Sequence, residues 1–128
     1  MMEQALLVRN LLDPPNGERS ARDPAVSGEE YFESLLTGPS GLRVERILSR
    51  GQTSGEGFYY EQEQDEWVLV MEGAARIACE DGRQVDLKRG DALFLPKKLR
   101  HRVSFTSDPC FWLAIHGHGL KPCPPAED

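Results

Sequence analysis

The chain has 128 residues, of which 39% are hydrophobic and 28% charged, and these values are typical of one soluble globular domain. It carries 15 Lys and Arg against 21 Asp and Glu, a formal net charge of -6. This balance argues against nucleic acid as a partner, because binding there depends on neutralising phosphates. No apolar run reaches membrane-spanning length, and the first residues lack the cationic and apolar regions of a signal peptide. We therefore expect a cytoplasmic protein with no membrane partner.

The cysteine content indicates neither a disulfide framework nor a zinc knuckle. The three cysteines are Cys79, Cys110 and Cys123, an odd number without a closely spaced pair. We expect buried or incidental thiols without a reactive role.

The first forty residues are predicted to form an arm and one short helix. The stretch DPPNGERSARDP, residues 13–24, holds three prolines and a glycine, which favours a surface loop. Ser27 to Gly38 is typical of a helix, because Ser27 can cap its start and Glu30 has the capping-box spacing. Apolar residues four positions apart would give this helix one apolar side: Tyr31, Phe32, Leu35 and Leu36.

From Leu42 onward the sequence predicts short strands and no helix. Asp81-Gly82 suits a two-residue hairpin turn, which needs positive φ. Eight short strands at this spacing are typical of an antiparallel sandwich or barrel, so the fold class is all-β. We assign residues 1–40 to the arm and helix, 41–117 to the barrel and 118–128 to a tail. The strands are expected near 42–49, 57–62, 66–72, 74–80, 83–87, 92–95, 101–106 and 110–116.

Two stretches on these strands resemble the two sequence motifs of the cupin superfamily. In EWVLVMEG, six residues separate Glu66 from Gly73, and GDALFLPKKLRH contains Gly90, Pro96 and His101 at the second motif's spacing. The chain is similar to small single-domain bacterial cupins of the conserved-barrel type, whose biochemical role is mostly unassigned. The resemblance covers about residues 42–116 and implies a single jelly-roll barrel with its site inside.

In cupins the first motif normally supplies two histidines and a glutamate, and the second motif supplies a third histidine. Together they hold a divalent transition metal, such as zinc, iron, nickel or manganese. By spacing, Glu66 and His101 match two of these ligands, whereas the other two positions fall on Tyr60 and Gln62. Since a phenol and a neutral amide are poor ligands for these metals, the resemblance implies a partly degenerate metal site.

Two residues of this opening stretch are candidates for other roles inside the barrel. Tyr60 is the candidate catalytic residue, because a phenol in a pocket can donate a proton or orient a substrate. Gln62 is a candidate ligand-binding residue. A register shifted by one residue would instead place Tyr59 and Glu61 inside. The acids of this stretch are interpreted as a solvated hairpin: Glu61, Glu63 and Asp65.

The last strand offers an imidazole for the incomplete metal set. FWLAIHGHG contains His116, which strand alternation places on the same face as Ala114. In a cupin barrel this strand runs antiparallel beside the one that opens with Glu66, so His116 would arrive near Glu66 and His101. Two imidazoles and a carboxylate are a common catalytic metal set. Alternatively, His116 lies at the barrel rim, and His118 is expected in the tail.

A cationic stretch precedes the last strands. Six Lys and Arg fall within residues 88–102, which favours either a solvated strand face or a cationic rim for a small anion. Arg100 and Arg102 are expected to point away from the pocket and to pair with acids such as Glu61 or Glu63.

Three functions are compatible with these patterns. The first is a metal-dependent enzyme acting on a small molecule, with Glu66, His101 and His116 as metal ligands. The second is a barrel that binds a small-molecule ligand without metal or catalysis, and the third is a structural role. We also expect a homodimer, both from family habit and because barrel edges are seldom left open.

Overall fold

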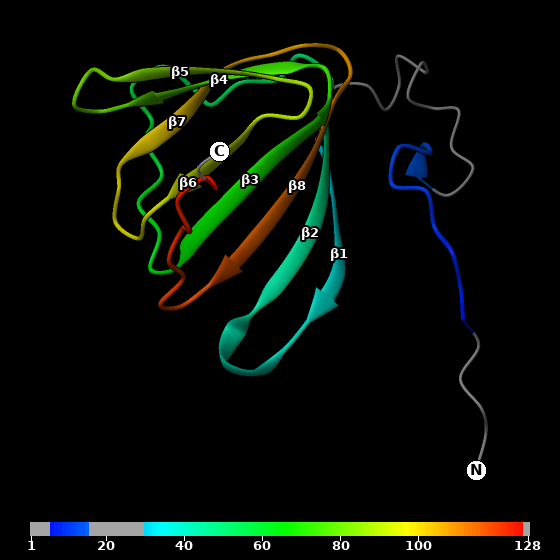
Figure 1. Ribbon diagram of the computed structural model, residues 1–128. Coiled ribbons are helices and arrows are strands. Elements are labelled where there is room, and N and C mark those ends of the chain that lie inside the picture. Colours follow the sequence, from blue (N-terminus) through cyan, green and yellow to red (C-terminus); the bar gives the residue numbers. More distant parts are fainter. Residues whose placement is uncertain (1–5, 16–29, 127–128) are drawn as a thin grey trace.

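The computed structural model describes residues 6–15 and 30–126, and within them eight strands form two antiparallel sheets (Figure 1). The larger sheet has the order β1-β2-β8-β3-β6 and the smaller one β5-β4-β7. This arrangement confirms the all-β jelly roll. The strands are β1 Tyr31–Thr37, β2 Arg43–Ser49, β3 Asp65–Glu72, β4 Ala74–Cys79, β5 Gln84–Lys88, β6 Ala92–Leu95, β7 His101–Thr106 and β8 Cys110–Gly117.

The predicted helix from Ser27 to Gly38 is wrong. Its first residues, 27–29, lie outside the described part of the chain, and from Tyr31 the backbone is the strand β1, which pairs antiparallel with β2. Exposure along β1 alternates between successive residues rather than following a helical period. The aromatic residues of this segment suit a strand, and pairing with β2 outweighs the local capping signal. The only helical element in residues 30–126 is a short 3-10 turn, Pro39–Gly41.

The strand predicted near residues 57–62 is also wrong. Residues 50–64 form one long connection from β2 to β3, and within it only Tyr60 makes an isolated bridge, to His101. Each backbone N–H of this pair donates to the other residue's carbonyl, at 2.7 and 3.1 Å. The connection is thereby fixed across the start of β7, which brings its side chains to one end of the barrel.

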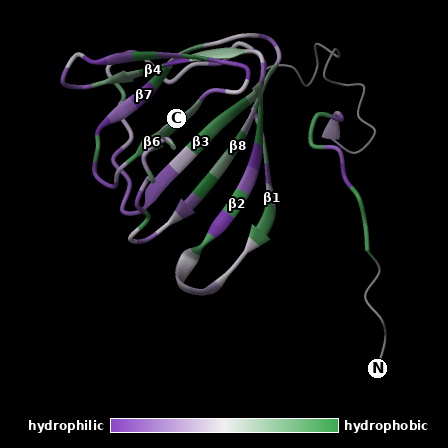
Figure 2. Cartoon of the chain, in the orientation of Figure 1, coloured by the Kyte–Doolittle hydropathy of each residue, from purple (hydrophilic) through white to green (hydrophobic). Residues whose placement is uncertain are grey.

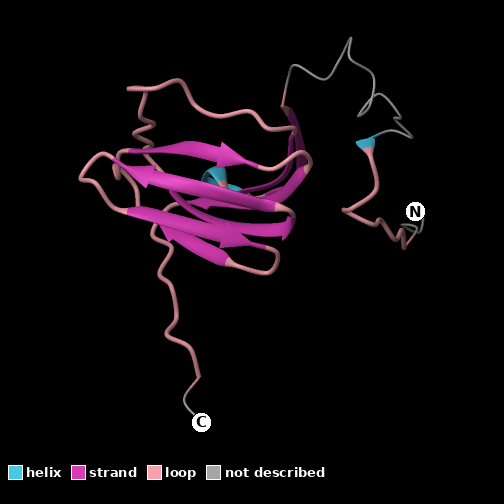
Figure 3. Ribbon diagram, turned by 90° about the horizontal axis from the view of Figure 1, so that it is seen from above, coloured by secondary structure: helices cyan, strands magenta, loops and turns pink. Residues whose placement is uncertain are grey.

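Apolar side chains from both sheets fill the space between them. The strands stack in layers when seen from above (Figure 3). The core cluster comprises Val68, Val70, Ala75, Ile77, Leu87, Leu95, Cys110, Trp112 and Ala114. Cys79 and Cys110 are buried free thiols, and burial raises the pKa of Cys110 to about 12, so this thiol stays protonated and unreactive.

The polar end of the barrel arises from the antiparallel pairing of β3 with β8. β3 begins hydrophilic and becomes hydrophobic along its length, whereas β8 becomes hydrophilic towards its end (Figure 2). Because the two strands run in opposite directions, Glu66 lies directly opposite His116. No helix among the described residues is long and apolar enough to cross a membrane.

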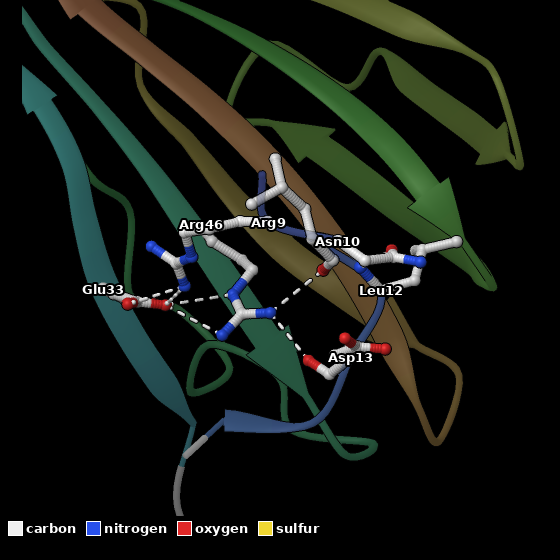
Figure 4. A network of polar contacts seen from close by, with 7 residues as sticks. Arg9, Asn10, Leu12, Asp13, Glu33 and Arg46 are labelled. Carbon is white, nitrogen blue, oxygen red and sulfur yellow. Dashed lines mark hydrogen bonds and ion pairs between the residues drawn. The ribbon is translucent and has the colours of Figure 1, made fainter. Parts of the chain in front are cut away.

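The N-terminal segment of residues 6–15 is attached to β2 through one buried arginine (Figure 4). Arg46 is 3% exposed, and its guanidinium donates to the carbonyls of Leu11 and Asp13 at 3.0 and 2.7 Å. The same guanidinium donates to the Glu33 carboxylate of β1 at 2.8 Å, and Arg9 also binds this carboxylate. Arg46 therefore joins the N-terminal segment and the β1–β2 hairpin.

Candidate functional site

A pocket of about 230 Å³ lies at the polar end of the barrel, where β3 begins and β8 ends. This volume is below the roughly 300–1,000 Å³ of pockets that hold drug-sized ligands, so the pocket suits a small metabolite. Its polar lining is Glu30, Arg43, Glu45, Tyr60, Gln62, Glu66, His101 and His116. Its apolar lining is Phe32, Ile47, Val68, Ile77, Leu95, Val103 and Trp112.

His116 lies between two carboxylates on one wall of the pocket. It is directly opposite Arg43 of β2 on one side and Glu66 of β3 on the other. Its Nε2 donates to Oε1 of Glu45 at 3.1 Å and lies 3.9 Å from Oε2 of Glu66. Since a carboxylate only accepts hydrogen bonds, the Nε2 atom of His116 carries the proton in this arrangement.

The two carboxylates on this wall have pKa values shifted in opposite directions. The hydrogen bond from His116 lowers the pKa of Glu45, and Arg43 contributes in the same direction. Burial raises the pKa of Glu66, although the charges of His116 and His101 partly offset that effect. Environments that separate the pKa values of two neighbouring carboxyls are typical of acid–base sites. Glu45 thus ionises at a lower pH than an ordinary glutamate, whereas Glu66 keeps its proton to a higher pH.

His101 presents its second ring nitrogen from the facing sheet. Its Nδ1 donates to the backbone carbonyl of Leu99 at 2.9 Å, so in the neutral ring Nε2 is the lone-pair atom available to the pocket. The ring of Tyr60 lies beside it, with centroids 5.9 Å apart, and Phe58 packs edge-on against Tyr60 at 4.9 Å. The two walls therefore carry one imidazole each.

Comparison with known proteins agrees with this architecture. The family model of the cupin domain matches residues 47–116. The chain belongs to the cupin family. A crystal structure of a candidate mannose-6-phosphate isomerase from Ralstonia eutropha JMP134 is 38% identical, with a TM-score of 0.74 over 89% of this chain and 100% of that one. No curated protein matches the chain.

More distant solved structures share the fold alone. A cupin superfamily protein from Desulfitobacterium hafniense DCB-2 is 17% identical, with a TM-score of 0.61 over 71% of this cupin and 79% of that chain. An RmlC-like cupin from Desulfovibrio desulfuricans is 16% identical, with a TM-score of 0.62 over 88% and 97% of the two chains.

The residues expected to hold a metal all line the pocket of this cupin but do not form a metal-binding group. No three His, Cys, Asp or Glu side chains of residues 6–15 and 30–126 are placed to share a metal ion. The Nε2 proton of His116 points at Glu45, and Tyr60 and Gln62 stand on the pocket at the first-motif positions. In this arrangement the donor set does not fit zinc, iron, nickel or manganese, and the metal set of Glu66, His101 and His116 stays a prediction.

The register of the opening stretch is settled by what each side chain contacts. Tyr60 and Gln62 line the pocket, whereas the ring of Tyr59 lies 5.9 Å from the guanidinium of Arg100. Arg100 also pairs with Glu61 at 3.1 Å. Arg100 thus points away from the pocket and pairs with Glu61, as predicted.

Asp65 departs from the solvated hairpin that was expected for the acids of this stretch. It is 7% exposed, and its carboxylate accepts the backbone N–H groups of Lys97 and Leu120 at 2.9 Å each. The bond from Lys97 is the main cause of its lowered pKa. Asp65 therefore joins three segments at the polar end, while Glu61 and Glu63 are exposed as expected.

Sequence reasoning missed several pocket residues on β2 and near the start of β1. Arg43 and Glu45 lie on β2, and Glu30 and Phe32 lie at and before the start of β1. The latter two were missed because β1 was interpreted as a helix. For β2 a signal existed, since Arg43, Glu45 and Ile47 alternate with Val44, Arg46 and Leu48. Because buried charged side chains need polar partners, charged residues on both faces of this strand indicate polar contacts on both sides of the sheet.

Proposed function

We propose that this cupin is an enzyme that transfers protons within a small hydroxylated carbonyl compound, as in the interconversion of an aldose and a ketose. The observation that carries the proposal is the placement of an acid and a base on facing walls of one pocket. Glu66 lies on β3 beside His116, and His101 lies on β7 of the other sheet.

The proposed reaction uses His101 as the base and Glu66 as the acid. Nε2 of His101 removes a proton from the carbon that bears the hydroxyl, while protonated Glu66 donates its proton to the neighbouring carbonyl oxygen. The product of this step is an enediol. Return of the proton from His101 to the other carbon, and of a hydroxyl proton to Glu66, completes the isomerisation and restores both groups.

The other polar residues support these two. The ionised Glu45 holds His116 in one tautomer through their hydrogen bond. This bond also keeps the imidazole of His116 beside the carboxyl group of Glu66. Tyr60 stands next to His101 and is proposed to orient a substrate hydroxyl. The name of the 38% identical structure, a candidate isomerase, supports the same class of reaction.

The test is exchange of substrate hydrogen with solvent. Incubation with mannose or glyceraldehyde in D₂O should exchange the hydrogen on the hydroxyl-bearing carbon for deuterium, which proton NMR detects as loss of its signal. We expect H101Q and E66Q to slow exchange by about 100-fold or more, the usual contribution of general acid–base catalysis. E61Q is the matched control, because Glu61 pairs with Arg100 outside the pocket.

A barrel that binds without catalysis is the second candidate, favoured by Tyr60 and Gln62 at positions where cupins carry histidines. Binding of these compounds without any exchange would favour this reading. Exchange at equal rates in the wild type, H101Q and E66Q would refute the assignment of acid and base.

We also propose a homodimer. β1 is an edge strand, and its Phe32 and Leu36 are 58% and 67% exposed. Apolar side chains on an open strand edge favour association with another chain. A monomeric mass in sedimentation equilibrium at micromolar concentration would contradict this proposal.

A further inference from the structure

The wall of the pocket carries more negative than positive charge. Beside the proposed acid Glu66, two carboxylates line it, those of Glu30 and Glu45, whereas Arg43 is the one permanent cation among the described residues that line it. Nε of Arg43 lies 3.7 Å from Oε2 of Glu45, so its charge already faces a carboxylate. A ligand with several negative charges would therefore enter an acidic site.

Other nearby cations do not relieve this imbalance. Arg100 pairs with Glu80 at 2.7 Å and with Glu61 at 3.1 Å, outside the pocket. Arg46 is bound to Glu33 and to the N-terminal segment. None of the six Lys and Arg side chains within residues 88–102 belongs to the described lining of the pocket.

We infer that the substrate is an uncharged polyhydroxy carbonyl compound, a free sugar rather than a sugar phosphate. This inference rests on the proposed function and narrows its substrate class. A phosphate group carries about -1.5 to -2 charges at neutral pH and is normally bound by clustered arginines or by a helix N-terminus. Among the described residues the pocket offers a single arginine and no helix.

The same lining suits hydroxyl groups. Carboxylates accept hydrogen bonds from hydroxyls, and the amide of Gln62 both donates and accepts. Nε of Arg43 is buried without a hydrogen-bond partner, which leaves a donor for a ligand oxygen. The half-exposed ring of Tyr60, held by Phe58, adds an aromatic surface at the pocket. Hydrogen-bond donors, acceptors and an aromatic ring in one pocket match an uncharged polyol.

The test compares mannitol with mannitol 1-phosphate, two alditols that lack a carbonyl and so cannot be isomerised. Binding is measured by calorimetry or by protein NMR shifts at neutral pH. We expect mannitol 1-phosphate to bind about tenfold or more weakly than mannitol, because like charges brought together oppose binding. Equal or tighter binding of the phosphate would overturn the inference, and so would no binding of either alditol.

Paired variants assign the preference to the pocket. E30Q removes one lining charge and keeps an oxygen that can accept the hydrogen bond from Ser49 Oγ. E30Q should therefore reduce the difference in binding affinity between mannitol and mannitol 1-phosphate. E61Q removes one negative charge outside the pocket and should leave this difference in affinity unchanged. An equal effect of both variants would mean that net charge, not the pocket, sets the preference. Because the alditols measure binding alone, failure here is distinct from failure of hydrogen exchange.

Discussion

Glu45 and His116 are joined by a hydrogen bond of 3.1 Å although 71 positions separate them in the sequence. The same imidazole nitrogen lies 3.9 Å from the carboxylate of Glu66. One ring therefore faces two carboxyl groups, of which the nearer has a lowered pKa and the more buried a raised one. This difference can be measured, because each shift couples protonation to the free energy of unfolding.

Replacing each carboxyl group with an amide should change stability in opposite directions. Because its pKa is lowered in the fold, ionised Glu45 stabilises the protein above the unfolded-state pKa of about 4.3, and this contribution is lost as pH falls through the folded value. E45Q should therefore lower stability at pH 7, by about 1 kcal/mol for a weakened hydrogen bond, and have less effect in acid.

For Glu66 the expected effect of the amide substitution on stability has the opposite sign. Its pKa is raised, so the contribution of the protonated group is complete below the unfolded-state pKa and is lost as pH rises through the folded value. E66Q, which resembles the protonated form, should raise the melting temperature at pH 8 and leave it nearly unchanged at pH 4. Thermal unfolding from pH 4 to 9 measures both variants, and shifts of the same sign at pH 8 would contradict the assignment.

Removing Arg46 should destabilise the attachment of the N-terminal segment. R46M deletes a buried guanidinium bound to Glu33 and to the carbonyls of Leu11 and Asp13. We expect a loss of about 2 kcal/mol in urea unfolding and faster proteolysis of residues 6–15. R9A is the control, because Arg9 binds the same Glu33 from a half-exposed position and should cost about 0–1 kcal/mol. Equal losses in the two variants would rule out a special role for Arg46.

The positions of the strands after residue 42 could be predicted because their signals are local. Alternating apolar residues and turn glycines mark seven of the eight strands, and each of these lies within a few residues of its expected place. The strand β1 could not be recognised, since its apolar residues fit a helix as well as a strand. What decides between them is the pairing of Tyr31 with Leu48 and of Phe32 with Ile47, which is a contact between distant segments.

The residues of the candidate site likewise include some that could be predicted from the sequence and some that could not. His116 opposite Glu66 followed from alternation and from the antiparallel neighbours that the family resemblance implies. Glu45 was missed, because its meeting with His116 depends on the register of β2 against β8, and no local pattern fixes that register. The sequence also could not show that Glu45 faces Nε2 of His116.

Gly73 should tolerate no side chain at the turn between β3 and β4. Its φ is +93°, and an added Cβ would lie 2.5 Å from the carbonyl oxygen of Pro109 and 3.0 Å from Cα of Cys110. G73A therefore adds an overpacking cost to the strain of a left-handed backbone. Gly82 has a similar φ of +100° but open space around it, so G82A is the matched control. We expect G73A to lose about 2 kcal/mol more than G82A in chemical unfolding; equal losses would contradict the close approach.

The predicted metal set is tested by titrating wild type and H116A with zinc, nickel and iron, using protein purified without a chelating tag. For Nε2 of His116 to bind a metal, it must lose its proton and its hydrogen bond to Glu45, which opposes binding. Without His116, only Glu66 and His101 remain of the predicted set, and two ligands hold a metal weakly. From this geometry we expect wild type and H116A to bind each metal with equal, weak affinity at pH 7. A tight one-to-one complex in the wild type that H116A abolishes would instead establish His116 as a ligand. It would show that the wall around His116 rearranges on binding, and it would favour a metal-dependent enzyme over the proposed acid–base isomerase.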